Sequence, residues 1–238
     1  MSSKTAAATL TLLSLYAVAM AQLEAVVVIY MRQLYYPEQP LELFPLEFLT
    51  RYDPMVELSR EVSTIVMIIA VALLAERQNL TRRFAAFVYV FGLWDVCYYA
   101  WLKILFGWPR TWLEWDVLFL IPVIWLGPWI CPAAIGLLFC VWGVLVLGSN
   151  RRIIFSGRHV ALFVVGASVG LVAFMQPAAS FVMRAGREAL VGYVPDHFSW
   201  PLYILGYCMM TLGLLGSLRD RPCETTIQVQ AGNGEGLN

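Results

Sequence analysis

Charge is the first thing this chain has little of. Charged side chains make up 13% of its 238 residues, against about 25% in soluble globular domains. Apolar residues make up 60%, and sixteen basic residues balance sixteen acidic ones. This composition excludes a water-soluble globule and a disordered chain, and the balanced charge offers nucleic acid no basic surface. We therefore expect an integral membrane protein whose partner is the lipid bilayer, with no nucleic acid.

Residues that bind metals and cofactors are also scarce. The chain has two histidines, His159 and His197, which we expect near opposite membrane faces, so together they would not hold a haem. A zinc site needs more histidines or cysteine pairs, and the five cysteines form no C-x-x-C pair. No serine–histidine–acid order, phosphate loop or H-E-x-x-H motif occurs. We therefore predict no cofactor and no metal site, and the motifs identify no catalytic residue.

Long apolar runs are what the chain does have. About 20 apolar residues cross a bilayer as a helix, and the chain holds enough such runs for about six spans in one all-α membrane domain, residues 1–221. Pro122, Pro128 and Pro132 interrupt the fourth run. Because proline breaks helical hydrogen bonding, we expect residues 117–131 to form a bent or re-entrant entry to that span. The expected helices cover residues 6–31, 55–75, 84–108, 132–148, 154–175 and 198–218, followed by a disordered cytoplasmic tail, residues 222–238.

The first run also resembles a signal peptide, since Ala19-Met20-Ala21 has the form of a cleavage site. The apolar run continues to Met31, however, and is then a full span, which favours an uncleaved helix. With six spans both termini lie on one side. Basic residues near span ends stay in the cytoplasm, and their modest excess on that side predicts cytoplasmic termini.

Ionisable residues inside the apolar runs are the main functional signal. An unpaired charge near the bilayer centre costs about 3 kcal/mol or more, so such residues face the bundle interior and find partners. At about 1.5 Å per residue along a helix, five such residues fall between the midplane and the outer surface: Glu24, Arg60, Glu61, Asp95 and Lys103. Asp95, Tyr99 and Lys103 share one helix face because they are four residues apart. We expect an outward-facing cavity bounded by Glu24, Arg60, Glu61, Asp95, Tyr99 and Lys103, with Trp115 and Asp116 at its rim.

Acids outnumber bases in this predicted cavity, and the surplus grows when Glu57 is included. A protonated carboxyl group or a bound cation would relieve the surplus. Three interpretations stay open. The first is a pocket that binds or relays a proton, cation or small polar ligand. The second is a structural subunit of a larger membrane complex, with static ion pairs and a small-residue interface at residues 166–170. The third is a membrane enzyme that acts on a lipid or quinone with an acid and a base from this group.

Several segments resemble a known family. They are residues 23–30 (LEAVVVIY), 34–37 (LYYP), 91–99 (FGLWDVCYY), 107–109 (GWP) and 115–122 (WDVLFLIP). They are similar to a family of uncharacterised prokaryotic multi-span integral membrane proteins, over most of the first 130 residues. The resemblance implies a protein of the bacterial inner (plasma) membrane. The family has no assigned activity, so the resemblance implies no mechanism.

Overall fold

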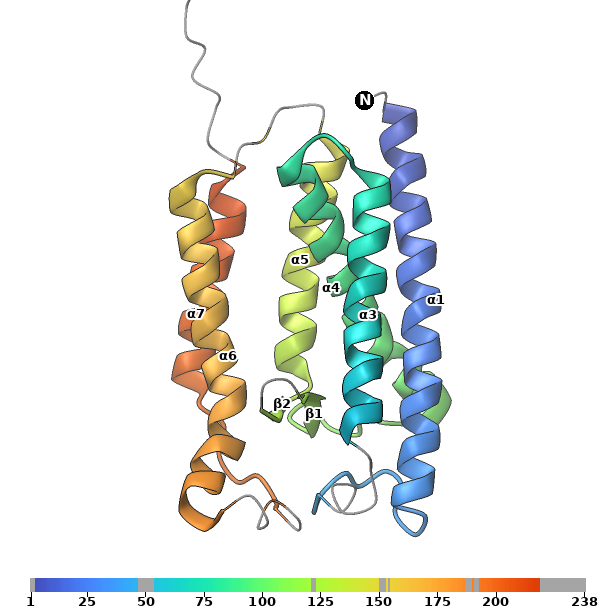
Figure 1. Ribbon diagram of the computed structural model, residues 1–238, viewed down its shortest axis with the longest axis vertical. Helices are drawn as coiled ribbons and strands as arrows, with labels where there is room; N and C mark the ends of the chain where they lie inside the picture. The colour runs from blue at the N-terminus through green and yellow to red at the C-terminus, as the bar shows by residue number, and fades with distance from the viewer. Residues whose placement is uncertain are drawn as a thin grey trace, which may run out of the picture.

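The chain folds into a bundle of helices closed at one end by a short β-hairpin. The computed structural model describes residues 3–46, 54–120, 123–149, 153, 155–186, 190 and 193–218. Consecutive helices run in alternating directions, so α1 begins and α7 ends at the end of the bundle opposite the hairpin (Figure 1). The elements in chain order are α1 (Ser3–Tyr35), α3 (Pro54–Ala75), α4 (Leu80–Phe106), β1 (Trp115–Phe119), β2 (Trp125–Pro128), α5 (Ile130–Gly148), α6 (Gly157–Ala185) and α7 (Trp200–Gly216).

The predicted all-α membrane bundle is confirmed. The five helices α1, α3, α4, α5 and α6 are long and apolar enough to cross a bilayer, and α7 is a shorter apolar helix. Large apolar side chains cover the outer surface of the bundle, where Leu12, Leu137 and Leu212 are each more than half exposed. In water such a surface would be strongly unfavourable, whereas against lipid tails it has no cost. The chain therefore has the surface of a membrane protein.

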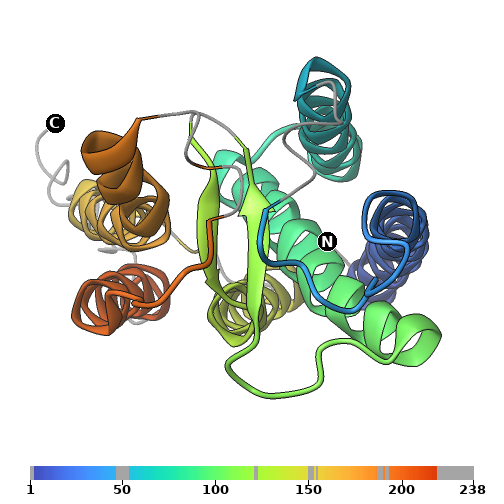
Figure 2. The ribbon, with the colours of Figure 1, turned by 90° about the horizontal axis from the view of Figure 1, so that it is seen from below.

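The re-entrant entry predicted for residues 117–131 is wrong in its form. Strands β1 and β2 pair antiparallel there, with Asp116 opposite Gly127 and Val117 opposite Leu126. Seen from the hairpin end, the strands lie across the middle of the bundle, between α6 and α7 on one side and α1, α3 and α4 on the other (Figure 2). Pairing satisfies backbone groups that the prolines prevent from forming a helix. The proline-rich segment therefore forms a hairpin that closes one end of the bundle.

Several predicted helix ends also differ from the structure. Helix α4 begins at Leu80, one turn earlier than predicted, because the Asn79 side chain accepts a hydrogen bond from the Arg82 backbone at 3.0 Å and caps the first turn. It ends at Phe106, and the next residue, Gly107, has a φ of 78° that suits glycine. Helix α6 continues past the predicted end at residue 175 to Ala185 and contains Pro177. The predicted disordered tail, residues 222–238, lies outside the described residues.

Helix α6 packs against α7 through glycine. An added Cβ at Gly206 would lie 2.6 Å from the backbone nitrogen of Gly170, and one at Gly166 would lie 2.7 Å from that of Met210. Backbones can approach so closely only where side chains are absent. Gly166 and Gly170 therefore allow α6 to pack closely on α7 within the chain, while Ser168 between them is exposed. The interface with another subunit at this face stays a prediction.

Substitution Gly206→Leu is expected to push α6 and α7 apart. Overpacking a tight contact costs about 1–3 kcal/mol, so the midpoint of thermal unfolding in mild detergent should fall. Gly148→Leu is the matched control, because nothing lies within 4 Å of an added Cβ there. Equal midpoints for the two variants would contradict this packing.

Candidate functional site

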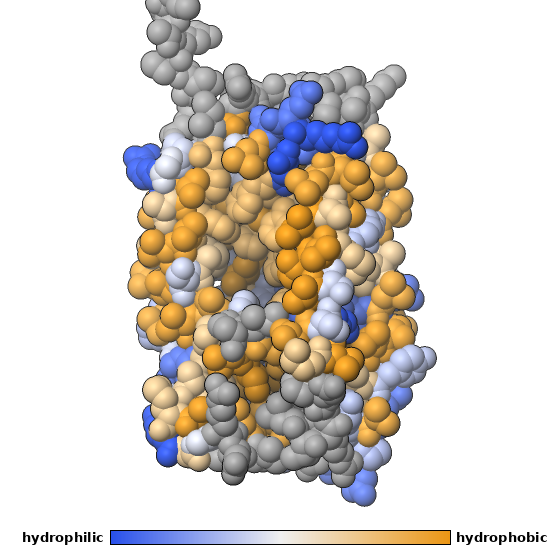
Figure 3. All heavy atoms as spheres, viewed as in Figure 1, coloured by the Kyte–Doolittle hydropathy of each residue, from blue (hydrophilic) through white to orange (hydrophobic). Residues whose placement is uncertain are grey.

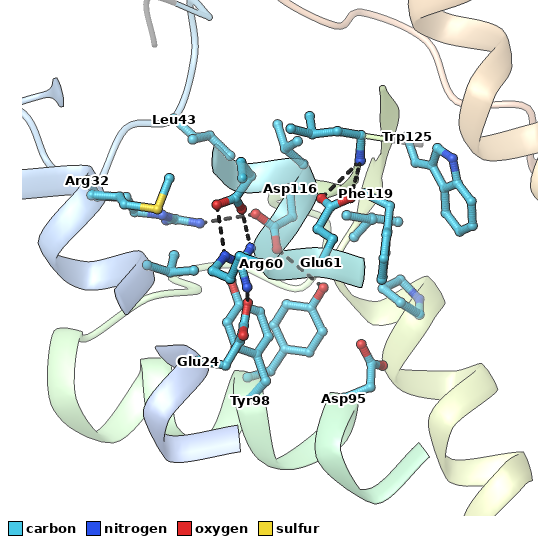
Figure 4. A pocket seen from close by; sticks show the side chains of 18 of the residues that line it. Glu24, Arg32, Leu43, Arg60, Glu61, Asp95, Tyr98, Asp116, Phe119 and Trp125 are labelled. Carbon is cyan, nitrogen blue, oxygen red and sulfur yellow. Dashed lines mark hydrogen bonds and ion pairs between the residues drawn. The ribbon is translucent and has the colours of Figure 1, made fainter. Parts of the chain in front are cut away.

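A cavity of about 220 Å³ lies near the hairpin end of the bundle. Side chains from α1, α3, α4, α5 and α6 line it together with both strands of the hairpin. Charged side chains from the first three helices and the hairpin gather at one part of the cavity, as the close view shows (Figure 4). Five carboxyl groups and two guanidinium groups line it: Glu24, Glu57, Glu61, Asp95, Asp116, Arg32 and Arg60.

Arg60 on α3 joins two helices. Its guanidinium forms ion pairs with Glu24 of α1 and with Glu57, one turn earlier on α3. Each of the three side chains is less than one-third exposed. A charge at this depth is tolerated when a partner of opposite sign is present. The triad therefore holds α1 beside α3, two helices that otherwise touch little.

Arg32 and Asp116 form the most deeply buried ion pair of the site. Arg32 Nη2 lies 3.0 Å from Asp116 Oδ1, and their side chains are 4% and 3% exposed. The guanidinium carbon of Arg32 lies 4.1 Å from the centre of the Trp108 ring, and Tyr99 donates to Asp116 Oδ2 at 3.3 Å. Burial raises the pKa of the Asp116 carboxyl, and Arg32 opposes that effect. This pair ties the end of α1 to strand β1.

Glu61 connects α3 to the hairpin, and among the described residues no cationic side chain forms a hydrogen bond with it. Its two carboxyl oxygens lie 3.1 and 3.3 Å from the backbone nitrogen of Leu120, which donates to them. Leu120 follows β1 directly, where the ladder has already been interrupted between Val117 and Phe119. A backbone N–H that the ladder does not use is thus satisfied by a carboxyl group.

Asp95 lies in the interior of α4, and the described residues leave its Oδ2 atom buried without a hydrogen-bond partner. The carboxyl group lies against α5 at Gly136, where an added Cβ would be 3.2 Å from Oδ2. Helices α4 and α5 approach closely here, because an added Cβ at Gly136 would also lie 2.8 Å from the Gly92 carbonyl oxygen. Glycine on α5 therefore makes room for the Asp95 carboxyl beside the cavity.

Unpartnered polar atoms are concentrated at this cavity. Among the described residues, six buried side-chain nitrogen or oxygen atoms have no hydrogen-bond partner, and five of them belong to residues that line it. Most buried polar atoms in folded proteins are hydrogen-bonded, so each exception needs an explanation. The five are Nε and Nη1 of Arg32, Nε1 of Trp94, Oδ2 of Asp95 and Nε1 of Trp125.

The other end of the cavity is apolar. Phe119 and Trp125 of the hairpin line it, with ring centres 5.3 Å apart. Phe174 of α6 also lines it; an added Cβ at Gly127 would be 2.8 Å from this ring. The space-filling view shows the surface hollowed between α6 and α3, with apolar residues around the hollow (Figure 3). The cavity is thus charged at one end and aromatic at the other.

The structure brings together most of the side chains predicted to bound the cavity. Lys103 is the exception, because its Nζ donates to the backbone oxygens of Gly107 and Pro109 at 3.3 and 2.8 Å. The Lys103 amine thus donates hydrogen bonds to carbonyl groups just beyond the end of α4. Lys103 lines a separate neighbouring pocket. The predicted side chains that line the cavity are Glu24, Arg60, Glu61, Asp95 and Tyr99.

The predicted rim is also different. Asp116 is 2% exposed and belongs to the interior of the cavity. Trp115 does not line the cavity, and its ring packs at 88° to that of Phe198, with ring centres 6.0 Å apart. Trp115 and Asp116 are neighbours on β1, and neighbouring side chains of a strand point to opposite faces.

Sequence reasoning missed Arg32 as a member of the site. The first helix was predicted to end at residue 31, whereas α1 continues through Arg32 to Tyr35. Glu24, Val28 and Arg32 are each four residues apart and line the cavity together. This spacing was the signal that could have identified Arg32. Trp94, Tyr98, Phe119 and Trp125 carried no comparable signal, because aromatic residues are common throughout the chain.

Removing one member of the buried Arg32–Asp116 pair is expected to destabilise the bundle. Asp116→Asn leaves the Arg32 guanidinium buried without its counter-charge, and breaking such a pair costs about 3–5 kcal/mol. Thermal unfolding in detergent should show a large loss, and the double variant Arg32→Met with Asp116→Leu should recover part of it. Glu42→Gln is the control, because Glu42 and Arg110 are half exposed and 3.9 Å apart, a pair worth about 0–1 kcal/mol. A loss no larger for Asp116→Asn than for the control would contradict the role given to this pair.

Comparisons with known proteins identify no relative of this chain. No protein-family model, curated protein or solved structure matches the chain. The resemblance of its first half to a family of prokaryotic membrane proteins therefore stays a prediction. Function is inferred from the site alone.

Proposed function

We propose that the protein binds a small bilayer-soluble ligand in this cavity, with the polar part of the ligand at the charged end and its apolar part among the aromatic rings. The observation that carries the proposal is the concentration of unpartnered buried polar atoms at one cavity. Ligand sites are typically concave and mostly apolar, with a few polar groups that fix the orientation of the ligand. This cavity has that composition.

Charge limits what the polar part of the ligand can be. Five carboxyl groups and only two guanidinium groups line the cavity, and both guanidinium groups already have carboxylate partners. A further negative charge beside these carboxylates would be repelled in a medium of low dielectric constant. The polar part of the ligand is therefore uncharged or cationic, which excludes fatty acids and phosphate esters.

We also propose the location of the site. Arg77, Arg82, Arg83 and Arg158 lie at or near helix ends opposite the hairpin, and basic residues at span ends favour the cytoplasm. The cavity would then lie in the outer half of a bacterial inner membrane, with both chain termini cytoplasmic. The hollow between α3 and α6 gives a ligand access from the lipid phase.

Filling the cavity is expected to remove the ligand. The protein would be purified in mild detergent, and native mass spectrometry would measure the molecules that remain bound. Ile135→Trp adds a large ring at a half-buried position that lines the cavity, so the bound molecule should disappear. Leu137→Trp is the matched control, because this side chain on the same helix is 59% exposed and should retain the ligand.

Two results would contradict the proposed function. One is a wild-type protein that carries no small molecule in its native mass spectrum. The other is a molecule that stays bound to Ile135→Trp. Stoichiometric co-purification of other membrane chains, with no small molecule, would support a structural subunit of a larger complex instead.

A further inference from the structure

The acids of the cavity differ in how their charge is balanced. Glu24 and Glu57 share Arg60, and Asp116 pairs with Arg32. Glu61 accepts a backbone hydrogen bond from Leu120. Asp95 differs from all four, because no ion pair or hydrogen bond reaches its Oδ2 atom within the described residues. Among the described residues, Asp95 and Glu61 are thus the cavity acids without an ion pair, and of these two only Asp95 has a buried oxygen without a hydrogen-bond partner.

Aromatic residues lie on both sides of Asp95 along its own helix. Phe91 and Tyr99 lie one turn before and one turn after Asp95, so the three share a face of α4. Trp94 lines the same cavity and is 7% exposed. Aromatic faces attract cations through their negative electrostatic potential, and the attraction grows when water is excluded. A carboxylate next to aromatic rings is the environment in which organic ammonium groups are bound.

The arrangement of the carboxyl groups distinguishes an organic cation from a metal ion. In the part of the chain that is described, no three acidic, histidine or cysteine side chains are grouped so that they could hold a metal. Calcium and magnesium need several oxygen ligands converging on one point. An ammonium group can be held instead by one carboxylate together with aromatic faces.

We propose that the ligand is a lipophilic organic ammonium, with its charged nitrogen at Asp95 and its apolar body among Phe119, Trp125 and Phe174. This inference rests on the proposed function and names the class of its ligand. The amine would neutralise a carboxylate whose Oδ2 atom has no hydrogen-bond partner among the described residues. Its apolar body would extend toward the hollow between α3 and α6 (Figure 3).

A matched pair of probes tests the inference. 4-Phenylbutylammonium and 4-phenylbutan-1-ol have nearly the same shape, but only the first carries a charge. Binding would be measured by isothermal titration calorimetry on the full chain in phosphatidylcholine nanodiscs. The heat of partitioning into protein-free nanodiscs would be subtracted. We expect the ammonium to bind at least about tenfold more tightly than the alcohol, a preference equivalent to one decade in Kd.

Variants at Asp95 assign the preference to its carboxyl group. Asp95→Asn, which keeps the size of the side chain, should bind both probes equally, and Asp95→Glu should keep a preference for the ammonium. Asp196→Asn is the control, because Asp196 is exposed and lies outside the cavity. Amounts of each variant in the membrane would be compared first, and Asp95→Glu keeps the test informative if the asparagine variant does not accumulate.

Three results would overturn the inference. They are equal affinity of the wild type for the two probes, a preference for the ammonium that survives Asp95→Asn, and absence of binding by both probes. If the probes bind equally and Ile135→Trp weakens both, the cavity binds ligands but not through charge, so the proposed function stands while the inference fails. If the native mass spectrum shows no bound molecule and neither probe binds, both fail.

Discussion

The low dielectric constant inside the bundle controls the architecture at the hairpin end. A charge placed there must find a partner, because the medium offers no water to solvate it. Arg32 meets this requirement through Asp116, and Arg60 through Glu24 and Glu57. The Arg32–Asp116 and Arg60–Glu24 pairs connect elements that are distant in sequence. The need to neutralise these charges thus fixes where α1, α3 and the hairpin lie relative to one another, and the cavity is the space that they enclose.

The hairpin has two roles in this arrangement. Asp116 and the backbone of Leu120 supply partners for side chains on α1 and α3. Phe119 and Trp125 supply the aromatic surface at the other end of the cavity. Because Gly127 has no Cβ, the Phe174 ring of α6 can lie against the hairpin there. A segment that prolines exclude from the helices therefore connects the charged wall, the aromatic wall and the α6–α7 pair.

Packing of the helices divides the bundle into parts of different tightness. Helix α4 lies closely on α5 where Gly92 and Gly136 meet, and α6 lies closely on α7 where Gly166 and Gly206 meet. Arg82 strengthens the α4–α5 unit, because it donates to the carbonyl oxygens of Val146 and Leu147 at the end of α5. The hollow between α3 and α6 lies between less closely packed parts. Tight glycine contacts thus hold α4 to α5 and α6 to α7, and the hollow lies outside both pairs.

The sequence by itself determined the number and approximate positions of the membrane helices, because each span must be apolar over about 20 residues whatever its neighbours are. It also indicated that Glu24, Arg60, Glu61 and Asp95 would face a common interior, since a lone charge in lipid is too costly and helical spacing shows which residues share a face. The tertiary structure alone decided which charge meets which partner. Arg32 and Asp116 pair across 84 positions, and Lys103 turns instead to the carbonyl oxygens at the end of its own helix. The partner of each charged side chain depends on distances between separate elements and on where the proline-rich segment folds. The periodicity of a single apolar run contains no information about either.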